Sequence, residues 1–204
     1  MPKEKQQTVL ESRKHLKMPL SERFDAALVL AASLHRRQAR KASGVPYVAH
    51  LLSVASLVLE DGGSEDMAIA ALLHDAAEDQ GGEETLAIIA EAFGVPVARW
   101  VRQASDTLSL PKPEWEMRKQ HHLAEIPRAD REARLIMLAD KVHNARSILA
   151  DHARVGSEVW ERFSAPRERT IWYYEALLDV FERGLSPVLY DTLSDCVRQI
   201  KELD

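Results

Sequence analysis

The stretch Ala70-Ala-Leu-Leu-His-Asp-Ala-Ala-Glu-Asp79 places an imidazole and three carboxylates in an otherwise apolar segment. A helix turns once in 3.6 residues, so the four polar residues would share one broad face of a single helix that points inward. Acids held away from water need a positive partner, and a divalent metal ion is the strongest one available. The spacing predicts that His74 and Asp75 hold this metal. Glu78 and Asp79, one turn later, are expected to handle water and protons.

Helical periodicity continues on both sides of this stretch. Two prolines exclude a helix from residues 108–113, which are the best candidate for a mobile loop. The sequence contains no alternating strand pattern and no internal repeat. The expected fold is therefore all-α, a single-domain helical bundle. Apolar stripes and caps predict further helices over residues 22–40, 47–59, 83–93, 97–107, 114–125 and 131–150, with two or three more over 157–203.

The bulk composition fits one folded domain. The chain has 204 residues, of which 46% are hydrophobic and 29% are charged, so it can bury a core. We expect an N-terminal extension over residues 1–20 and one domain over 21–204. Within that domain, the motifs that carry chemistry lie in 40–146 and the C-terminal helices in 157–204. The aromatic residues near the C-terminus are expected in the core or in an oligomer contact.

Net charge and cysteine content exclude several classes of protein. A net charge of −5 argues against a protein that coats nucleic acid, although a small anionic ligand needs only a local basic patch. The single cysteine, Cys196, excludes an intrachain disulfide framework, and a thiolate zinc site has no Cys-x-x-Cys pair to form it. The sequence shows no signal segment and no apolar stretch long enough for a membrane span, so a cytoplasmic location without membrane binding is expected. A homo-oligomer is possible.

A metal needs more ligands than one His-Asp pair, and two other segments can supply them. His50 lies in the first turns of an apolar helix, at the end of Gly44-Val-Pro-Tyr-Val-Ala-His50. Asp140 follows the apolar run Leu135-Ile-Met-Leu-Ala. With the His-Asp pair they give two imidazoles and two carboxylates. This mixed nitrogen–oxygen set suits manganese, iron or another first-row divalent ion, and it leaves positions open for water and substrate.

The order His, then His-Asp, then Asp resembles the pattern of the HD-domain phosphohydrolase superfamily. Three finer motifs narrow the resemblance to the alarmone hydrolases of the RelA/SpoT homologue group, and the spacing between the motifs is similar to that of the small Mesh-type enzymes. A lone His-Asp pair is a weak signal, but the flanked His-Asp-x-x-Glu-Asp motif is specific. The motifs are Arg40-Lys41 with Gly44 to His50, Leu72-Leu-His-Asp-Ala-Ala-Glu-Asp79, and Leu138-Ala-Asp-Lys-Val-His-Asn-Ala-Arg146.

This resemblance implies a manganese-dependent enzyme that removes pyrophosphate from the 3′ position of (p)ppGpp, a small anionic nucleotide. The positions that match metal ligands are His50, His74, Asp75 and Asp140. Glu78 and Asp79 match the pair that activates and orients the attacking water. The positions that match nucleotide contacts are Arg40, Lys41, Tyr47 and Asn144, together with Lys112 and Arg118 in a covering segment over residues 105–118.

Two departures from the family pattern leave the substrate open. Relatives commonly have Thr where this chain has Gln80, and Pro where it has Leu51. The first alternative is therefore a phosphohydrolase acting on another nucleotide, such as a monophosphate or NADPH. The second is a nucleotide sensor that binds without turnover, although the Glu78–Asp79 pair argues against a pure binder.

Several of these residues also have structural interpretations. The basic run that contains Arg40-Lys41 could be a solvated helix end that interacts with the helix dipole. Lys112 and Arg118 could be ordinary surface charges. His121-His122 and His143 resemble a metal cluster. We nevertheless expect surface or core roles for them, because the histidine pair has no carboxylates at matching helical positions.

Overall fold

The computed structural model describes residues 19–41, 43–109 and 111–204, so most of the expected N-terminal extension lies outside the described residues. The all-α expectation is confirmed: within these ranges the chain is helical, and its only β-type pairing is an isolated bridge between Ala39 and Pro46. The α-helices are α2 (Glu22–Leu34), α3 (Val48–Glu60), α4 (Glu65–Leu73), α5 (Ala76–Gln80), α6 (Glu83–Phe93), α7 (Val95–Ala104), α8 (Trp115–Glu125), α9 (Arg131–Val155), α10 (Arg167–Val180) and α11 (Pro187–Glu202). Short 3₁₀ helices follow α8 (η2, Ile126–Arg128) and α9 (η3, Gly156–Arg162).

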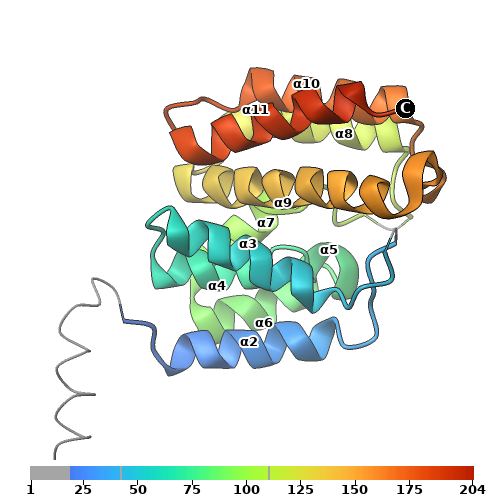
Figure 1. Cartoon of the computed structure of the whole chain (residues 1–204). Coiled ribbons are helices and arrows are strands. Elements are labelled where there is room, and N and C mark those ends of the chain that lie inside the picture. The colour runs from blue at the N-terminus through green and yellow to red at the C-terminus, as the bar shows by residue number, and fades with distance from the viewer. Residues whose placement is uncertain (1–18, 42, 110) are drawn as a thin grey trace, which may run out of the picture.

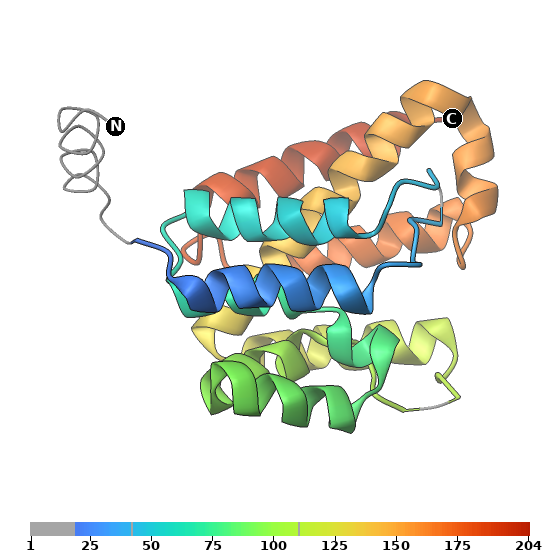
Figure 2. The ribbon, with the colours of Figure 1, turned by 90° about the horizontal axis from the view of Figure 1, so that it is seen from below.

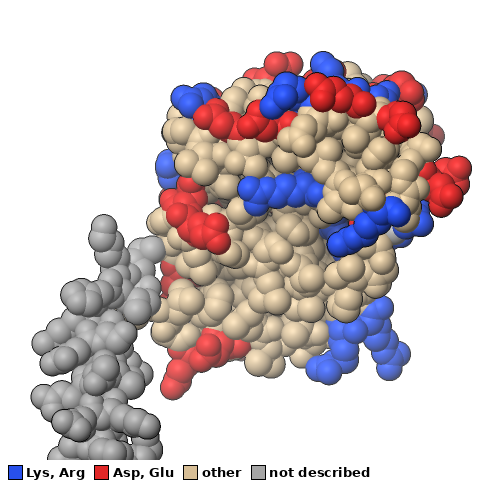
Figure 3. All heavy atoms as spheres, in the orientation of Figure 1, with Lys and Arg blue, Asp and Glu red and all other residues tan. Residues whose placement is uncertain are grey.

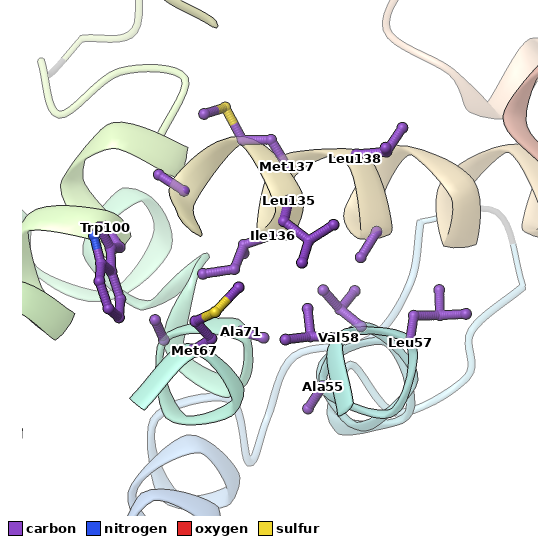
Figure 4. Close-up of a cluster of buried hydrophobic side chains, with 14 of the residues drawn as sticks. Ala55, Leu57, Val58, Met67, Ala71, Trp100, Leu135, Ile136, Met137 and Leu138 are labelled. Carbon is purple, nitrogen blue, oxygen red and sulfur yellow. The ribbon is translucent and has the colours of Figure 1, made fainter. Parts of the chain in front are cut away.

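Helix α9 runs through the middle of the molecule, with α3, α4 and α7 on one side and α10 and α11 on the other (Figure 1). This placement explains why its apolar run, Leu135 to Ala139, is continuous and not spaced at helical intervals: all five residues are buried. Figure 4 shows Leu135 and Ile136 pointing toward α3 and α4, while Met137 points the other way. One hydrophobic cluster joins these layers.

The expected helix over residues 22–40 is wrong at its end, because α2 stops at Leu34. The backbone beyond it finds other partners: the amide of Arg40 donates to the carbonyl of Val45, and the amide of Tyr47 donates to the carbonyl of Gln38. These bonds fold the described residues 35–41 and 43–47 into a bend that lies at the same end of the bundle as η3 in both views (Figures 1 and 2). Several Lys and Arg side chains lie at this end of the molecule, and others lie along its top (Figure 3).

The single helix expected over residues 70–79 is also interrupted. Helix α4 ends at Leu73 and α5 begins at Ala76, with His74 and Asp75 in the turn between them. The imidazole Nδ1 of His74 contacts the carbonyl of Ala71 at 2.8 Å, and an uninterrupted helix would pair this carbonyl with the Asp75 amide. The turn therefore keeps the His-Asp pair together but changes the direction of the segment that carries the next two acids.

Most other elements agree with the sequence prediction. Ser21 and Ser64 accept hydrogen bonds from amides in the first turns of α2 and α4, as helix N-caps do. Helix α9 extends five residues further than expected, and the described part of residues 108–113 contains no helix. Among the described residues, no helix combines the length and the apolar character that a membrane crossing needs.

Candidate metal centre and active site

Three separate parts of the chain bring four predicted ligands together. His50 comes from α3, His74 and Asp75 from the α4–α5 turn, and Asp140 from α9. One ligand atom each of His50, His74 and Asp140 lies within 4.8 Å of the other two, and the Oδ2 of Asp75 lies 3.0 Å from the Nε2 of His74 and 3.5 Å from that of His50. His50 and His74 are 1% and 2% exposed and the Asp140 side chain is 10% exposed, so these three groups have little contact with bulk water.

The donor set fits a divalent metal. The Nδ1 of His74 donates to the Ala71 carbonyl, so in the neutral imidazole the lone pair of Nε2 faces the two carboxylates. Although Asp75 is close to this nitrogen, Nε2 has no partner in hydrogen-bond geometry among the described residues. Burial opposes a charge on this imidazole, but Asp75 and Asp140 raise its pKa well above the usual value. The four groups therefore need a positive charge between them.

Both carboxylates are held in the ionised form that metal ligands require. Burial opposes ionisation of Asp140, but the adjacent Lys141 ammonium, 2.6 Å from Oδ2, and the two imidazoles lower its pKa well below the usual range. Asn144 donates to the other oxygen of Asp140 at 2.6 Å. Burial likewise opposes ionisation of Asp75, whose pKa His74 and His50 lower. These contacts fix which oxygens face the centre.

Helix α5 presents Glu78 and Asp79 beside this centre. The amide of Asp106 donates to Glu78 Oε2 at 2.8 Å, and Lys112 donates to Glu78 Oε1 at 2.9 Å and to Asp79 Oδ1 at 3.3 Å. Burial disfavours the charged form of Lys112, but these two carboxylates raise its pKa overall. The segment between α7 and α8 is thus tied to the two acids predicted to act on water.

Gln38 holds the remaining oxygen of Asp79, a role that no sequence pattern predicts. Its Nε2 donates to Asp79 Oδ2 at 2.7 Å, while its Oε1 accepts from Gln80 and contacts the Nδ1 of His35. Gln80 was noted only as a departure from the family pattern. No periodicity could have revealed this network, because the bend over residues 35–47 creates it.

A cavity of about 500 Å³ opens in front of the acids. Tyr47, Asp75, Glu78 and Asp79 form part of its wall. All six residues predicted to contact the nucleotide line it: Arg40, Lys41, Tyr47, Lys112, Arg118 and Asn144. Arg40 does not lie on a solvated helix end, because its guanidinium donates to Asn144 Oδ1 at 2.8 Å.

Further polar and aromatic residues line the cavity without having been predicted. Lys119 donates to Asp106 at 3.0 Å, and its ammonium lies 4.9 Å from the ring centroid of Tyr173. Tyr173 and Tyr174 of α10 are buried, as expected of the C-terminal aromatics, but they also form part of the cavity wall. Because α10 follows the last motif, only the folded chain brings it to the site.

The histidines His121, His122 and His143 do not form one cluster. His121 is exposed, and His122 is buried with its Nδ1 3.9 Å from Asp106. His143 instead contacts the predicted metal centre: its Nδ1 lies 2.7 Å from the Nδ1 of His50. The expectation of a surface or core role therefore leaves out the main contact of His143.

Comparisons with known proteins point to one family. The HD domain family matches residues 27–171. The guanosine-3′,5′-bis(diphosphate) 3′-pyrophosphohydrolase MESH1 of Mus musculus is 38% identical over 121 residues, which span 58% of this chain and 65% of the mouse protein, just under two thirds of its length. The Xenopus tropicalis protein of the same name is 39% identical over 175 residues, covering 81% of this chain and 90% of that one. A solved structure described as a metazoan ortholog of SpoT that hydrolyzes ppGpp superposes with a TM-score of 0.74 at 28% identity, covering 89% of this chain and 97% of the other.

Proposed function

Because the chain belongs to the HD domain family, we propose that it is a metal-dependent hydrolase that removes the 3′-pyrophosphate from (p)ppGpp, giving GDP or GTP and pyrophosphate. The observation that carries this proposal is the buried His50–His74–Asp140 group, next to Asp75, which together with a pair of acids lines a cavity that also has basic side chains in its wall. We propose ppGpp as the substrate because the relatives and the solved structure described above act on it.

We propose that His50, His74, Asp75 and Asp140 hold the metal. When bound, Mn²⁺ or another first-row divalent ion polarises a phosphoryl oxygen and lowers the pKa of bound water. The protein's contribution is orientation: the Ala71 carbonyl fixes the His74 ring, and Lys141 and Asn144 fix the Asp140 carboxylate. Tyr47 donates to Asp75 Oδ2 at 2.5 Å and holds that carboxylate in the same way.

Glu78 and Asp79 are proposed to act on the attacking water. Glu78 takes the proton of this water, and Asp79 accepts a hydrogen bond that orients it. Donors on both oxygens of each carboxylate hold the pair toward the cavity: Gln38 and Lys112 for Asp79, the Asp106 amide and Lys112 for Glu78.

The basic wall of the cavity is proposed to bind the nucleotide. Arg40, Lys41, Lys112 and Arg118 supply charge to the non-bridging phosphate oxygens, and Tyr47 and Asn144 complete the contacts. A protein with a net charge of −5 concentrates these cations at one cavity, which favours a small anionic ligand over a nucleic acid. A volume of about 500 Å³ suits a nucleotide.

Anion-exchange separation of the products from ppGpp, with Mn²⁺-loaded protein, tests this function. We expect conversion to GDP and pyrophosphate by the native protein and none by the His74→Ala/Asp75→Ala variant. Equal turnover by the two proteins would contradict the site. Release of orthophosphate from NADPH or a monophosphate, without hydrolysis of ppGpp, would favour the alternative substrate over ppGpp.

The remaining expectations stay predictions. They are an N-terminal extension before a single domain over residues 21–204, a cytoplasmic location, and a possible homo-oligomer. Size-exclusion chromatography with light scattering measures the last of these directly.

A further inference from the structure

The two nitrogens of His50 face different partners. Its Nε2 points to the metal centre, 3.1 Å from Asp140 Oδ1 and 3.5 Å from Asp75 Oδ2. Its Nδ1 lies 2.7 Å from the Nδ1 of His143, with the ring centroids 4.8 Å apart. The His50 ring is 1% exposed, so water has no access to replace His143.

A contact of 2.7 Å between two imidazole nitrogens requires one proton between them. If His143 donates this proton, Nδ1 of His50 carries none. The single N–H proton of a neutral His50 must then lie on Nε2, where it points at the carboxylates. If His50 donates, its Nε2 carries a lone pair. Only the second arrangement leaves His50 able to ligate a metal, because a ligating nitrogen cannot also carry a proton.

We propose that His143 is a positioning residue for the metal centre, whose unprotonated Nδ1 accepts the hydrogen bond from His50 Nδ1 and so directs the His50 Nε2 lone pair to the metal. This inference rests on the proposed function, because it assumes that His50 is a ligand. In this arrangement, the two imidazole ligands are oriented in the same way. The Ala71 carbonyl accepts from Nδ1 of His74, and His143 accepts from Nδ1 of His50.

The position of His143 on α9 supports this role. Asp140 and His143 are three residues apart, so they lie on neighbouring positions of one helix surface. A single element thus supplies a carboxylate to the Nε2 side of His50 and an acceptor to its Nδ1 side. A shift of α9 would disturb both contacts, which ties the orientation of the His50 ring to the packing of the central helix.

Titration with Mn²⁺, followed by the electron paramagnetic resonance signal of the free ion, tests the inference in three variants. His143→Leu removes the acceptor, whereas His143→Asn keeps an oxygen at the same distance along the side chain as Nδ1. The exposed His121→Leu is the matched control. We expect His143→Leu to weaken Mn²⁺ binding about 10- to 100-fold. We expect His143→Asn to recover most of this affinity and His121→Leu to bind as the native protein does.

Kinetics at saturating Mn²⁺ separates positioning of the metal from binding of the nucleotide. We expect His143→Leu to lower kcat while KM for ppGpp changes little, because His143 does not line the cavity. Native affinity for Mn²⁺ in His143→Leu would overturn the inference, and so would equal losses in the Leu and Asn variants, since these indicate packing alone. A native protein that binds neither Mn²⁺ nor another first-row divalent ion would overturn the proposed metal centre and this role together.

Discussion

At the scale of single residues, the site is built from side chains that hold one another. Asp79 has a donor on each oxygen, Lys112 on Oδ1 and Gln38 on Oδ2. Only Gln38 is itself held in place by a second amide, because its Oε1 accepts from Gln80. The orientation of Asp79 therefore depends on a residue that no family motif named above contains.

Replacement of Gln38 by Leu tests this dependence. The variant keeps the side-chain size but loses a hydrogen bond to a charged group, which contributes about 1.5 kcal/mol or more. We expect kcat for ppGpp to fall about tenfold while KM changes less. Steady-state kinetics measures both. Gln80→Leu leaves the Gln38–Asp79 bond in place and should have a smaller effect, whereas an unchanged kcat in Gln38→Leu would remove Gln38 from the mechanism.

The sequence predicted the four candidate ligands that the fold brings together, but not the residues that contact and orient them. His50, the His-Asp pair and Asp140 stand in local patterns, each next to an apolar run that predicts burial. Gln38 and His143 contact their partners across 41 and 93 residues. Such contacts depend on how the elements pack, and a periodicity within one segment contains no information about them.

At the scale of elements, two interruptions of predicted helices form the site. The bend after α2 brings Arg40 and Tyr47 to the cavity, and the turn at His74-Asp75 redirects α5. Caps and glycines predicted most of the other boundaries, because they act on the backbone locally. Both interruptions instead rest on bonds made outside a helix ladder, such as that from the Tyr47 amide to the Gln38 carbonyl, which local propensity cannot predict.

The end of α5 is a point where the backbone geometry can be tested. Gly81 has a φ of 133°, and a Cβ built there would lie 2.7 Å from Thr85 Oγ1. Gly81→Ala should therefore lower the free energy of unfolding by about 1–2 kcal/mol or more, through strain and crowding together. Gly184 has ordinary backbone geometry and open space around it, so Gly184→Ala is the matched control and should be neutral or slightly stabilising. Urea unfolding of both variants measures the difference, and equal stabilities would contradict the strain at Gly81.

At the scale of the whole molecule, one central helix brings motifs that are far apart in the sequence together in one site. Helix α9 packs against α3, α4 and α7, and the segment before α8 reaches the acids of α5. The composition predicted that a core would form, and the need of a metal for further ligands predicted that His50 and Asp140 would lie beside the His-Asp pair; the sequence did not predict how the elements pack to bring them together. The physical reason is that buried polar groups must satisfy one another, which the finished packing alone makes possible.

Acid stability is a property of the whole fold that follows from one buried group. His122 is 3% exposed, and burial followed by the nearby Lys141 charge lowers its pKa to about 3. In the unfolded chain, the pKa of this imidazole is near 6.5. Between about pH 3 and pH 6.5, the unfolded chain therefore binds a proton at His122 and the folded protein does not. Stability from this group is therefore complete above about pH 6.5 and is lost as the pH falls toward 3, by about 2 kcal/mol between pH 7.5 and pH 5.

The variant His122→Gln should remove this dependence, because an amide does not titrate. Its own stability at pH 7.5 can differ from that of the native protein through packing, so the quantity to compare is the change in unfolding free energy between pH 7.5 and pH 5. We expect a smaller change in His122→Gln than in the native protein, and a native-sized change in His121→Gln, whose side chain is exposed. Other buried groups titrate alike in all three proteins, so they cancel in the comparison. If His122→Gln lost as much stability in acid as the native protein, protonation of His122 would have to be favourable inside the fold, against the burial of its ring.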